Sequence, residues 1–222
     1  MQQQRACRKQ ALGTSQHRPR RCPAAGRTLS GHRIALDGKP LYARHVQATA
    51  AQRRRIFVLT WLAYGAYYLC RRPFAICKTT LETKYHLNIV ALGHIETGYL
   101  IAYALGQFAF GLTADRIGSR RLLGCGMLAV AALSIAFGLS SLATVFAISY
   151  AVQGLFQATG WPGVVKAMTS MYREGERGTV MGIWATCYQA GGLVATALAT
   201  ALLAHFGWRL TFIVPAAFIA AL

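Results

Sequence analysis

Two adjacent arginines, Arg71 and Arg72, lie near one end of an apolar run from Ile56 to Ile76 that is long enough to cross a bilayer. A charged side chain inside a spanning helix costs about 2.5 to 3.5 kcal/mol on insertion scales, so such residues usually face a polar interior rather than lipid. A guanidinium stays charged at physiological pH and matches phosphate oxygens with two parallel donors. The pattern predicts a site for an anionic solute, with Arg71 as its anchor.

Tyrosines accompany Arg71 along the same stretch. At 3.6 residues per turn, Tyr64, Tyr68 and Arg71 lie on one face of a helix. The two hydroxyls either donate to the solute or belong to an aromatic packing stripe, and the sequence leaves both readings open. Arg72 points to another side, and we expect its charged end to extend toward the membrane surface.

A membrane-embedded scaffold must position these residues. More than half of the 222 residues are hydrophobic, and they come in long runs rather than at amphipathic spacing. A spanning helix needs about 20 residues. We therefore predict an all-α membrane protein with six transmembrane segments: Ile56–Ile76, Ile89–Thr113, Leu122–Leu139, Leu142–Val165, Val180–Phe206, and a last segment that starts near Leu210 and is cut off at Leu222.

The remaining polar residues of these segments have simpler expected roles. Glu96 either relays protons or is hydrated near the membrane surface. Lys166 is expected to reach lipid headgroups. Gln153, Gln157 and Gln189 are neutral and can hydrogen bond between helices.

Basic residues in the connections predict the orientation. Placing the N-terminus in the cytoplasm also places Asp115–Arg121 and Ser170–Arg177 there, and these two connections carry five arginines. Cytoplasmic loops carry an excess of Lys and Arg. Lys78 and Lys84, in the opposite connection, count against this orientation. We expect a bacterial inner (plasma) membrane protein with a cytoplasmic N-terminus.

We expect two regions, a basic tail over residues 1–54 and the membrane-embedded six-helix region over residues 55–222. About half of the 24 Lys and Arg precede Ile56, against one acid there, Asp37. The region lacks a sustained period, which predicts a mostly disordered tail. It fits a tail near anionic headgroups, an organelle transit peptide, or sequence upstream of the real start. No nucleic-acid partner is expected, because a span follows at once and aromatic residues are nearly absent.

The sequence predicts no enzyme. It contains no phosphate-cradling loop, no nucleophile elbow and no His/Glu zinc pair. The six cysteines fit no metal-site spacing and indicate small packing residues. We therefore expect no metal and no cofactor.

The connection between the second and third segments carries a specific motif, Gly111-Leu-Thr-Ala-Asp115-Arg116-Ile-Gly118-Ser-Arg120-Arg121. It resembles the signature loop of the major facilitator superfamily, which has Gly, three residues, Asp-Arg, any residue, Gly and then basic residues in this place. The resemblance implies a twelve-helix fold of which this chain is the N-terminal six-helix half. It also implies that Gly111, Asp115, Arg116, Gly118, Arg120 and Arg121 form a cytoplasmic latch that holds the inward-closed state.

A second motif narrows the family. Tyr64-Gly-Ala-Tyr67-Tyr68-Leu-Cys-Arg71-Arg72-Pro-Phe74 and Gly160-Trp161-Pro162-Gly163 look like the organophosphate:phosphate antiporters, which include the glycerol-3-phosphate and hexose-phosphate transporters. By this resemblance Arg71 binds phosphate in the N-terminal half. The second phosphate arginine of the family belongs to the C-terminal half, which is missing.

Two departures remove positive charge from the expected site. Gln107 stands where the family usually has Lys, and Tyr188 stands where the glycerol-phosphate members have His. We expect Arg71, Tyr64, Tyr68, Gln107 and Tyr188 to bind the solute. With one charge fewer, that solute is either a phosphate ester or a monoanion such as a carboxylate.

The function predicted from these features is transport of an anionic organic solute, an organophosphate or sugar phosphate exchanged for inorganic phosphate by alternating access. Three alternatives stay open. One is a proton-coupled facilitator for a different solute, the second is a transporter-like sensor of sugar phosphate, and the third is a non-functional remnant of a truncated gene.

Overall fold

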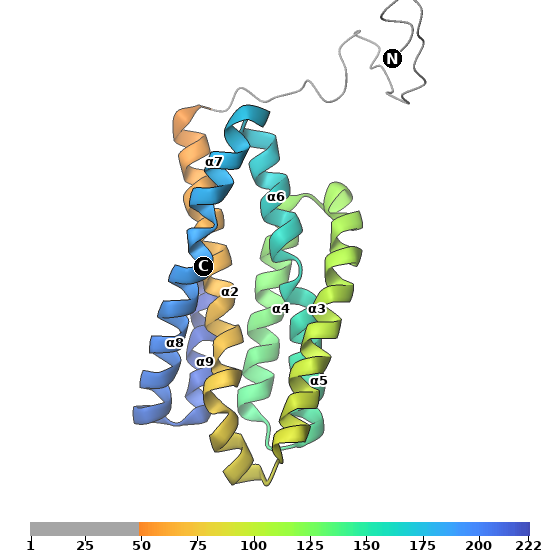
Figure 1. Cartoon of the computed structure of the whole chain (residues 1–222), viewed down its shortest axis with the longest axis vertical. Helices are drawn as coiled ribbons and strands as arrows, with labels where there is room; N and C mark the ends of the chain where they lie inside the picture. Colours follow the sequence, from red (N-terminus) through yellow and green to blue (C-terminus); the bar gives the residue numbers. More distant parts are fainter. Residues whose placement is uncertain (1–48) are drawn as a thin grey trace, which may run out of the picture. The chain divides into compact units, whose positions relative to one another are not determined.

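The computed structural model describes residues 49–222, apart from the side chain of Asp115. In that range the chain is a bundle of α-helices without strands (Figure 1). The helices are α2 (Ala50–Tyr85), α3 (Ile89–Ile117), α4 (Ser119–Leu139), α5 (Ala143–Gln157), α6 (Gly160–Met171), α7 (Glu174–Trp184), α8 (Thr186–Phe206) and α9 (Trp208–Ala221). The predicted all-α membrane bundle is confirmed.

Most of the expected tail, residues 1–48, lies outside the described residues. Helix α2 begins at Ala50, so the last five residues assigned to the tail are helical. Thr49 caps this helix: its hydroxyl accepts from the Gln52 N–H, and the Gln52 side chain accepts from the Thr49 N–H. The division into 1–54 and 55–222 stays a prediction.

The six predicted segments map onto the eight helices with two interruptions. The fourth segment is broken at Ala158 and Thr159, between α5 and α6. Pro162 lies in the first turn of α6, where its missing N–H needs no partner, and it prevents α5 from continuing as a regular helix. The fifth segment is interrupted at Ala185, between α7 and α8, where Thr186 bonds back to the Ile183 carbonyl.

Three stretches are long and apolar enough to cross a membrane by length and composition: Ile89–Ala114, Ser119–Leu139 and Glu174–Phe206. Trp208–Ala221 is a shorter apolar helix. Helix α2 is long enough to span, but Arg71 and Arg72 interrupt its apolar run. The stretches that do not reach the apolarity of a simple lipid-facing span are therefore the helix that carries these arginines and the broken α5–α6 segment.

The turns lie at two ends of the bundle. The α2–α3 end holds the turns at residues 86–88, 140–142 and 207, and the α3–α4 end holds the start of α2 and the connections at residues 118 and 172–173 (Figure 1). Gly118 and Gly207 adopt φ of +84° and +83°, a region that residues with a side chain rarely adopt, so each allows a turn of a single residue.

Small residues allow helices to approach closely. A methyl group at Gly191 of α8 would lie 2.8 Å from the Cα of Gly65 on α2. A methyl group at Gly154 of α5 would collide with the backbone carbonyl of Tyr99 on α3. Helix α2 packs most extensively on α8, and α3 on α5. These contacts bring α2, α3, α5 and α8 together around the residues predicted to bind solute.

The Gly154→Ala substitution is expected to lower the free energy of unfolding by about 1–3 kcal/mol, because the added methyl group overlaps the α3 backbone, which cannot rotate away. Thermal unfolding of the purified chain in detergent measures the loss. Gly182→Ala on α7 is the matched control, since no atom of another residue lies within 4 Å of the added methyl group. Equal melting temperatures for the two variants would contradict this packing.

Candidate solute-binding site

Arg71 is half-buried on α2 and points toward α3. Its guanidinium carbon lies 5.4 Å from the ring centre of Tyr99 and 5.8 Å from that of Tyr103. A cation over an aromatic face is stabilised by the ring quadrupole, most strongly where water is scarce. These contacts hold the guanidinium in place, and no carboxylate among the described residues pairs with it, so its N–H donors can bind an anion.

The backbone of α2 around Arg71 is held by side chains of α5. Pro73 lies inside α2 and provides no N–H to the turn before it. The Gln153 amide donates to the Cys70 carbonyl at 2.9 Å, and the Tyr150 hydroxyl donates to the Arg71 carbonyl at 3.5 Å. Neighbouring helices commonly supply such bonds near a proline in a membrane helix.

Gln157 completes this network. Its amide nitrogen donates to the Tyr67 carbonyl at 3.1 Å, and its amide oxygen accepts from the Tyr99 hydroxyl at 2.8 Å. Tyr99 is also the ring beneath the Arg71 guanidinium. The expectation that Gln153 and Gln157 bond between helices is confirmed. Gln189, in contrast, is exposed on α8.

Three of the residues predicted to bind solute lie together in an aromatic cluster. The ring centres of Tyr64 and Tyr188 are 5.2 Å apart, and Tyr68 lies 6.3 Å from each of them. Trp184, buried behind them, is 5.1 Å from Tyr64 and 5.7 Å from Tyr188. Both readings of the tyrosines therefore have support, since they pack on one another while Tyr68 also faces a cavity with Arg71.

Gln107 lies on α3, one turn after Tyr103, and is half-buried. Among the described residues it makes no hydrogen bond to the other four predicted site residues. Tyr103 is the α3 residue whose ring lies beside Arg71, with its centre 5.8 Å from the guanidinium carbon.

A cavity of about 270 Å³ lies beside Arg71, and we call it the Arg71 pocket. It is small enough to suit a compact anionic group. Arg72 also lines this pocket, and its guanidinium approaches Gly192 of α8. Arg72 thus reaches the edge of the same cavity, but it is exposed and points toward α8 while Arg71 points toward α3, as the sequence predicted. The lining residues are Tyr68, Arg71, Arg72, Ala75, Glu96, Tyr99, Leu100 and Tyr150.

An ion pair lies at the rim of this pocket. The Lys78 ammonium donates to the Glu96 carboxylate, joining α2 to α3, and Glu96 itself lines the pocket. The two side chains remain 29% and 41% exposed, respectively. Glu96 is thus paired with a cation and still exposed to water, and its alternative role as a proton relay stays a prediction.

The predicted latch residues lie at the α3–α4 end. Gly111 and Asp115 belong to α3, Gly118 forms the turn, and Arg116, Arg120 and Arg121 are exposed. Lys166 of α6 donates to the Ala114 carbonyl in the last turn of α3 at 2.9 Å. Lys166 therefore binds the end of a helix, whereas the sequence analysis predicted that it would reach a lipid headgroup. The latch role of the motif stays a prediction.

A second set of contacts ties α2 to the α6–α7 connection. Arg53 pairs with Glu176 at 3.2 Å and lies over the Tyr172 ring, while the Tyr172 hydroxyl donates to the Arg53 carbonyl. Burial raises the pKa of the Tyr172 hydroxyl, partly opposed by the Arg53 charge. Arg177 donates to the Tyr172 and Thr169 carbonyls. These contacts order the connection that follows the broken fourth segment.

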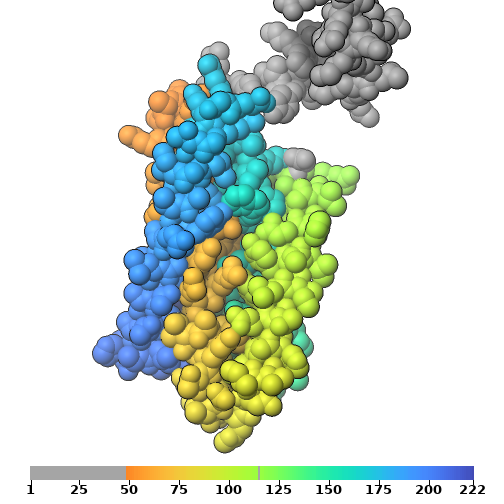
Figure 2. Space-filling model, viewed as in Figure 1, coloured from red at the N-terminus to blue at the C-terminus, as the bar shows by residue number. Residues whose placement is uncertain are grey.

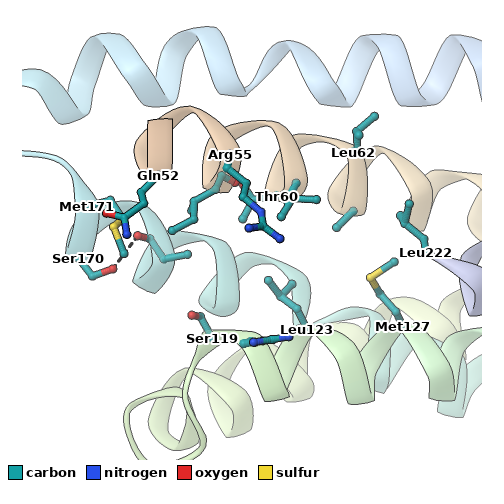
Figure 3. A pocket seen from close by; sticks show the side chains of 15 residues that line it. Gln52, Arg55, Thr60, Leu62, Ser119, Leu123, Met127, Ser170, Met171 and Leu222 are labelled. Carbon is teal, nitrogen blue, oxygen red and sulfur yellow. Dashed lines mark hydrogen bonds between the residues drawn. The ribbon is translucent and has the colours of Figure 1, made fainter. Parts of the chain in front are cut away.

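Another cavity of the bundle lies apart from the Arg71 pocket. It measures about 560 Å³ and is walled by Arg55 and Thr60 of α2 and by Leu123 and Met127 of α4, with Leu222 at its edge (Figure 3). Of the predicted functional residues, only Arg120 lines it. The smaller Arg71 pocket is the better candidate site, because it combines a half-buried cation with aromatic and hydroxyl groups from three helices.

The viewed face of the bundle shows α2 between α7–α8 on one side and α3 on the other (Figure 2). Sequence reasoning did not assign Tyr99, Tyr103 or Tyr150 to the site. The four-residue spacing of Tyr99 and Tyr103 was a usable signal, since it places both rings on one face of a helix. Nothing in the sequence showed that this face meets Arg71.

Comparison with known proteins supports the motif resemblance. Residues 56–222 match the family described as Major Facilitator Superfamily. "Membrane sensor protein UhpC" of Salmonella typhimurium is 30% identical over 162 residues, which is 73% of this chain and 37% of the relative. "Probable hexose phosphate transport protein" of Chlamydia trachomatis is 30% identical, over 73% of this chain and 36% of the relative.

A plant relative gives the same picture. "Putative glycerol-3-phosphate transporter 3" of Arabidopsis thaliana is 33% identical over 183 residues, which is 72% of this chain and 36% of the relative. The chain thus spans little more than a third of the length of the curated relatives that it matches. The matched region has the organisation of an N-terminal half of the family fold.

Replacing Gln157 by Leu is expected to lower the free energy of unfolding by about 1–2 kcal/mol, because the buried Tyr67 carbonyl and Tyr99 hydroxyl both lose their partner. Chemical or thermal unfolding in detergent measures this loss. The same change at exposed Gln189 is the control and should leave stability within about 0.5 kcal/mol. A Gln157→Leu variant that is as stable as the Gln189→Leu control would show that these hydrogen bonds do not contribute to the stability of the bundle.

Proposed function

This chain belongs to the Major Facilitator Superfamily, and on that premise we propose that it forms one half of a carrier that exchanges an organophosphate for inorganic phosphate by alternating access. Two similar relatives are named for hexose phosphate and for glycerol 3-phosphate. We extend that chemistry to this chain as a sugar phosphate or related phosphate ester.

The observation that carries the proposal is the Arg71 guanidinium, half-buried in a pocket and held by aromatic rings rather than by an acid. The oxygens of a phosphate group can accept hydrogen bonds from several N–H groups of this guanidinium. The low dielectric inside the bundle strengthens the attraction between the two charges. Arg71 binds the phosphate, and the hydroxyls of Tyr64, Tyr68 and Tyr188 line the path beside it. Gln107 faces the same path from α3.

Two features bear on the charge that the site accepts. Gln107 provides no positive charge, which favours a monoanion. Arg72, however, lines the same pocket as Arg71, and Lys78 lies at its rim through its contact with Glu96. These cations supply the charge that a doubly ionised phosphate ester requires, so the organophosphate reading takes precedence over a carboxylate solute.

The motif at the α3–α4 end is assigned to conformational exchange. Gly111, Asp115, Arg116, Gly118, Arg120 and Arg121 would hold this end closed in one state of the carrier and release it in the other. With this assignment, the α3–α4 end and the N-terminus would lie on the cytoplasmic side of the plasma membrane. Six helices provide one wall of a central path, so we expect no phosphate flux from liposomes that contain residues 1–222 alone.

A second candidate function is sensing, because one similar relative is named a membrane sensor protein. A sensor would bind sugar phosphate in the same pocket without moving it across the membrane. Binding without exchange, in the protein made from the longest reading frame that contains this chain, would favour the sensor.

Arg71→Gln is expected to reduce the exchange of radiolabelled phosphate for glucose 6-phosphate or glycerol 3-phosphate at least about 30-fold, because the solute loses a desolvated charge-assisted contact. The measurement is made in liposomes that contain the product of that reading frame. Arg54→Gln is the matched control, as the same change on an exposed side chain of α2 that lines neither cavity described above.

Exchange that survives Arg71→Gln at the level of the Arg54→Gln control would overturn the proposed role of Arg71. Exchange that is absent from the unaltered protein, together with intact phosphate binding, would replace the carrier by the sensor.

A further inference from the structure

The Lys78–Glu96 pair is placed to act on the Arg71 pocket. Lys78 follows Arg71 by seven residues, close to two full turns of α2, so both side chains leave the same face of the helix. Glu96 precedes Tyr99 by one turn of α3, and Tyr99 is the ring beneath the Arg71 guanidinium. Glu96 lines the pocket, and Lys78 donates to the Glu96 carboxylate.

The pair also shares a neighbour with Arg71. Tyr150 lines the same pocket as Arg71 and Glu96, and its hydroxyl donates to the Arg71 carbonyl. Counting the formal charges around the pocket gives three cations, Arg71, Arg72 and Lys78, against one anion, Glu96. The pocket with its rim therefore carries a net charge of two positive units, and Glu96 alone lowers it.

We propose that Lys78 is a further anion-binding residue of the pocket, and that Glu96 is its built-in counter-charge, which holds Lys78 when the pocket is empty and gives it up to an incoming phosphate group. The inference rests on the proposed function for the identity of the ligand. It adds two residues to the site and assigns them opposite effects on anion affinity.

The exposure of the pair suits this exchange of partners. A deeply buried ion pair cannot lose one member without leaving an uncompensated charge. Lys78 and Glu96 remain 29% and 41% exposed, so water can solvate Glu96 once Lys78 turns away. Ion pairs of this exposure are weak in most proteins, which lets a doubly charged ligand compete for the lysine.

A structural role predicts something different. If the pair only fastened α2 to α3 beside the turn at residues 86–88, loss of either charge would break the same contact. The two single variants would then change anion affinity, if at all, in the same direction. The proposed role predicts a rise in anion affinity when Glu96 is neutralised and a fall when Lys78 is neutralised.

A thiol at position 75 can report the charge of the pocket directly. Ala75 is exposed, lines the Arg71 pocket, and lies one turn from both Arg71 and Lys78 on α2. The test compares the reaction rates of Ala75→Cys with an anionic and a cationic methanethiosulfonate reagent, on the 222-residue chain in lipid nanodiscs. Cys7, Cys22 and exposed Cys125 are replaced by Ser, and the same chain without Ala75→Cys measures reaction at the buried cysteines.

We expect Glu96→Gln to raise the ratio of the anionic to the cationic rate about five-fold, and Lys78→Gln to lower it about five-fold, as one unit charge at this distance alters the local concentration of each reagent. The double variant should fall between the two. Glu82→Gln and Lys84→Gln, the same changes on exposed residues of α2, should shift the ratio less than two-fold.

Inorganic phosphate provides the second reading, with sodium chloride added to equal ionic strength. We measure the phosphate concentration that halves the rate of modification of the introduced thiol. This concentration should fall about five-fold in Glu96→Gln and rise about five-fold in Lys78→Gln. Rate ratios that stay unchanged, or that move in the same direction in both variants, would overturn the proposed pair. Opposite rate ratios without any protection by phosphate would instead refute the proposed ligand and leave the charge-setting role standing.

Discussion

The hydrogen bonds from α5 to the backbone of α2 are the constraint on which the candidate site depends. Gln153, Gln157 and Tyr150 donate to three carbonyl groups within the two turns before Pro73. Neighbouring helices commonly supply such polar contacts beside a proline in a membrane helix, and here all three come from α5. The same bonds fix where the α2 backbone lies, and so where the Arg71 side chain starts.

The aromatic residues extend this constraint from backbone to charge. The Tyr99 ring supports the Arg71 guanidinium while its hydroxyl donates to Gln157, which in turn donates to α2. Position, orientation and electrostatic support of one cation thus come from a single closed set of contacts among α2, α3 and α5. An anion that binds Arg71 meets a guanidinium whose orientation is already set, which reduces the entropy lost on binding.

The sequence predicted the bundle well, and it singled out Arg71 for the same reason, although the anchor role of Arg71 stays a prediction. Long apolar runs and a charge inside one of them are local signals that depend on the cost of polarity in lipid. Residues that act through another helix escaped prediction. Lys78 and Glu96 are 18 positions apart, and nothing in either neighbourhood shows that they meet. Gln107 was singled out by comparison with a family motif, while Tyr103, one turn earlier, makes the contact with Arg71.

The interruption of the fourth and fifth segments was also beyond the sequence pattern. Apolar runs indicate burial, and they look continuous even where the helix is interrupted before Pro162 or at Ala185. The breaks bring Thr159 to the Tyr67 hydroxyl and place Trp184 behind the tyrosine cluster. Irregular backbone at this depth is acceptable because other helices surround it.

The near contact of backbone at Gly65 and Gly191 limits how the bundle can deform. At this point no side chain lies between the two main chains, so sliding or rolling of one helix past the other would bring backbone atoms into collision. We therefore expect α2 and α8 to move together. Shape changes that expose or cover Arg71 must be taken up by the helices that contact these two through longer side chains, above all α3.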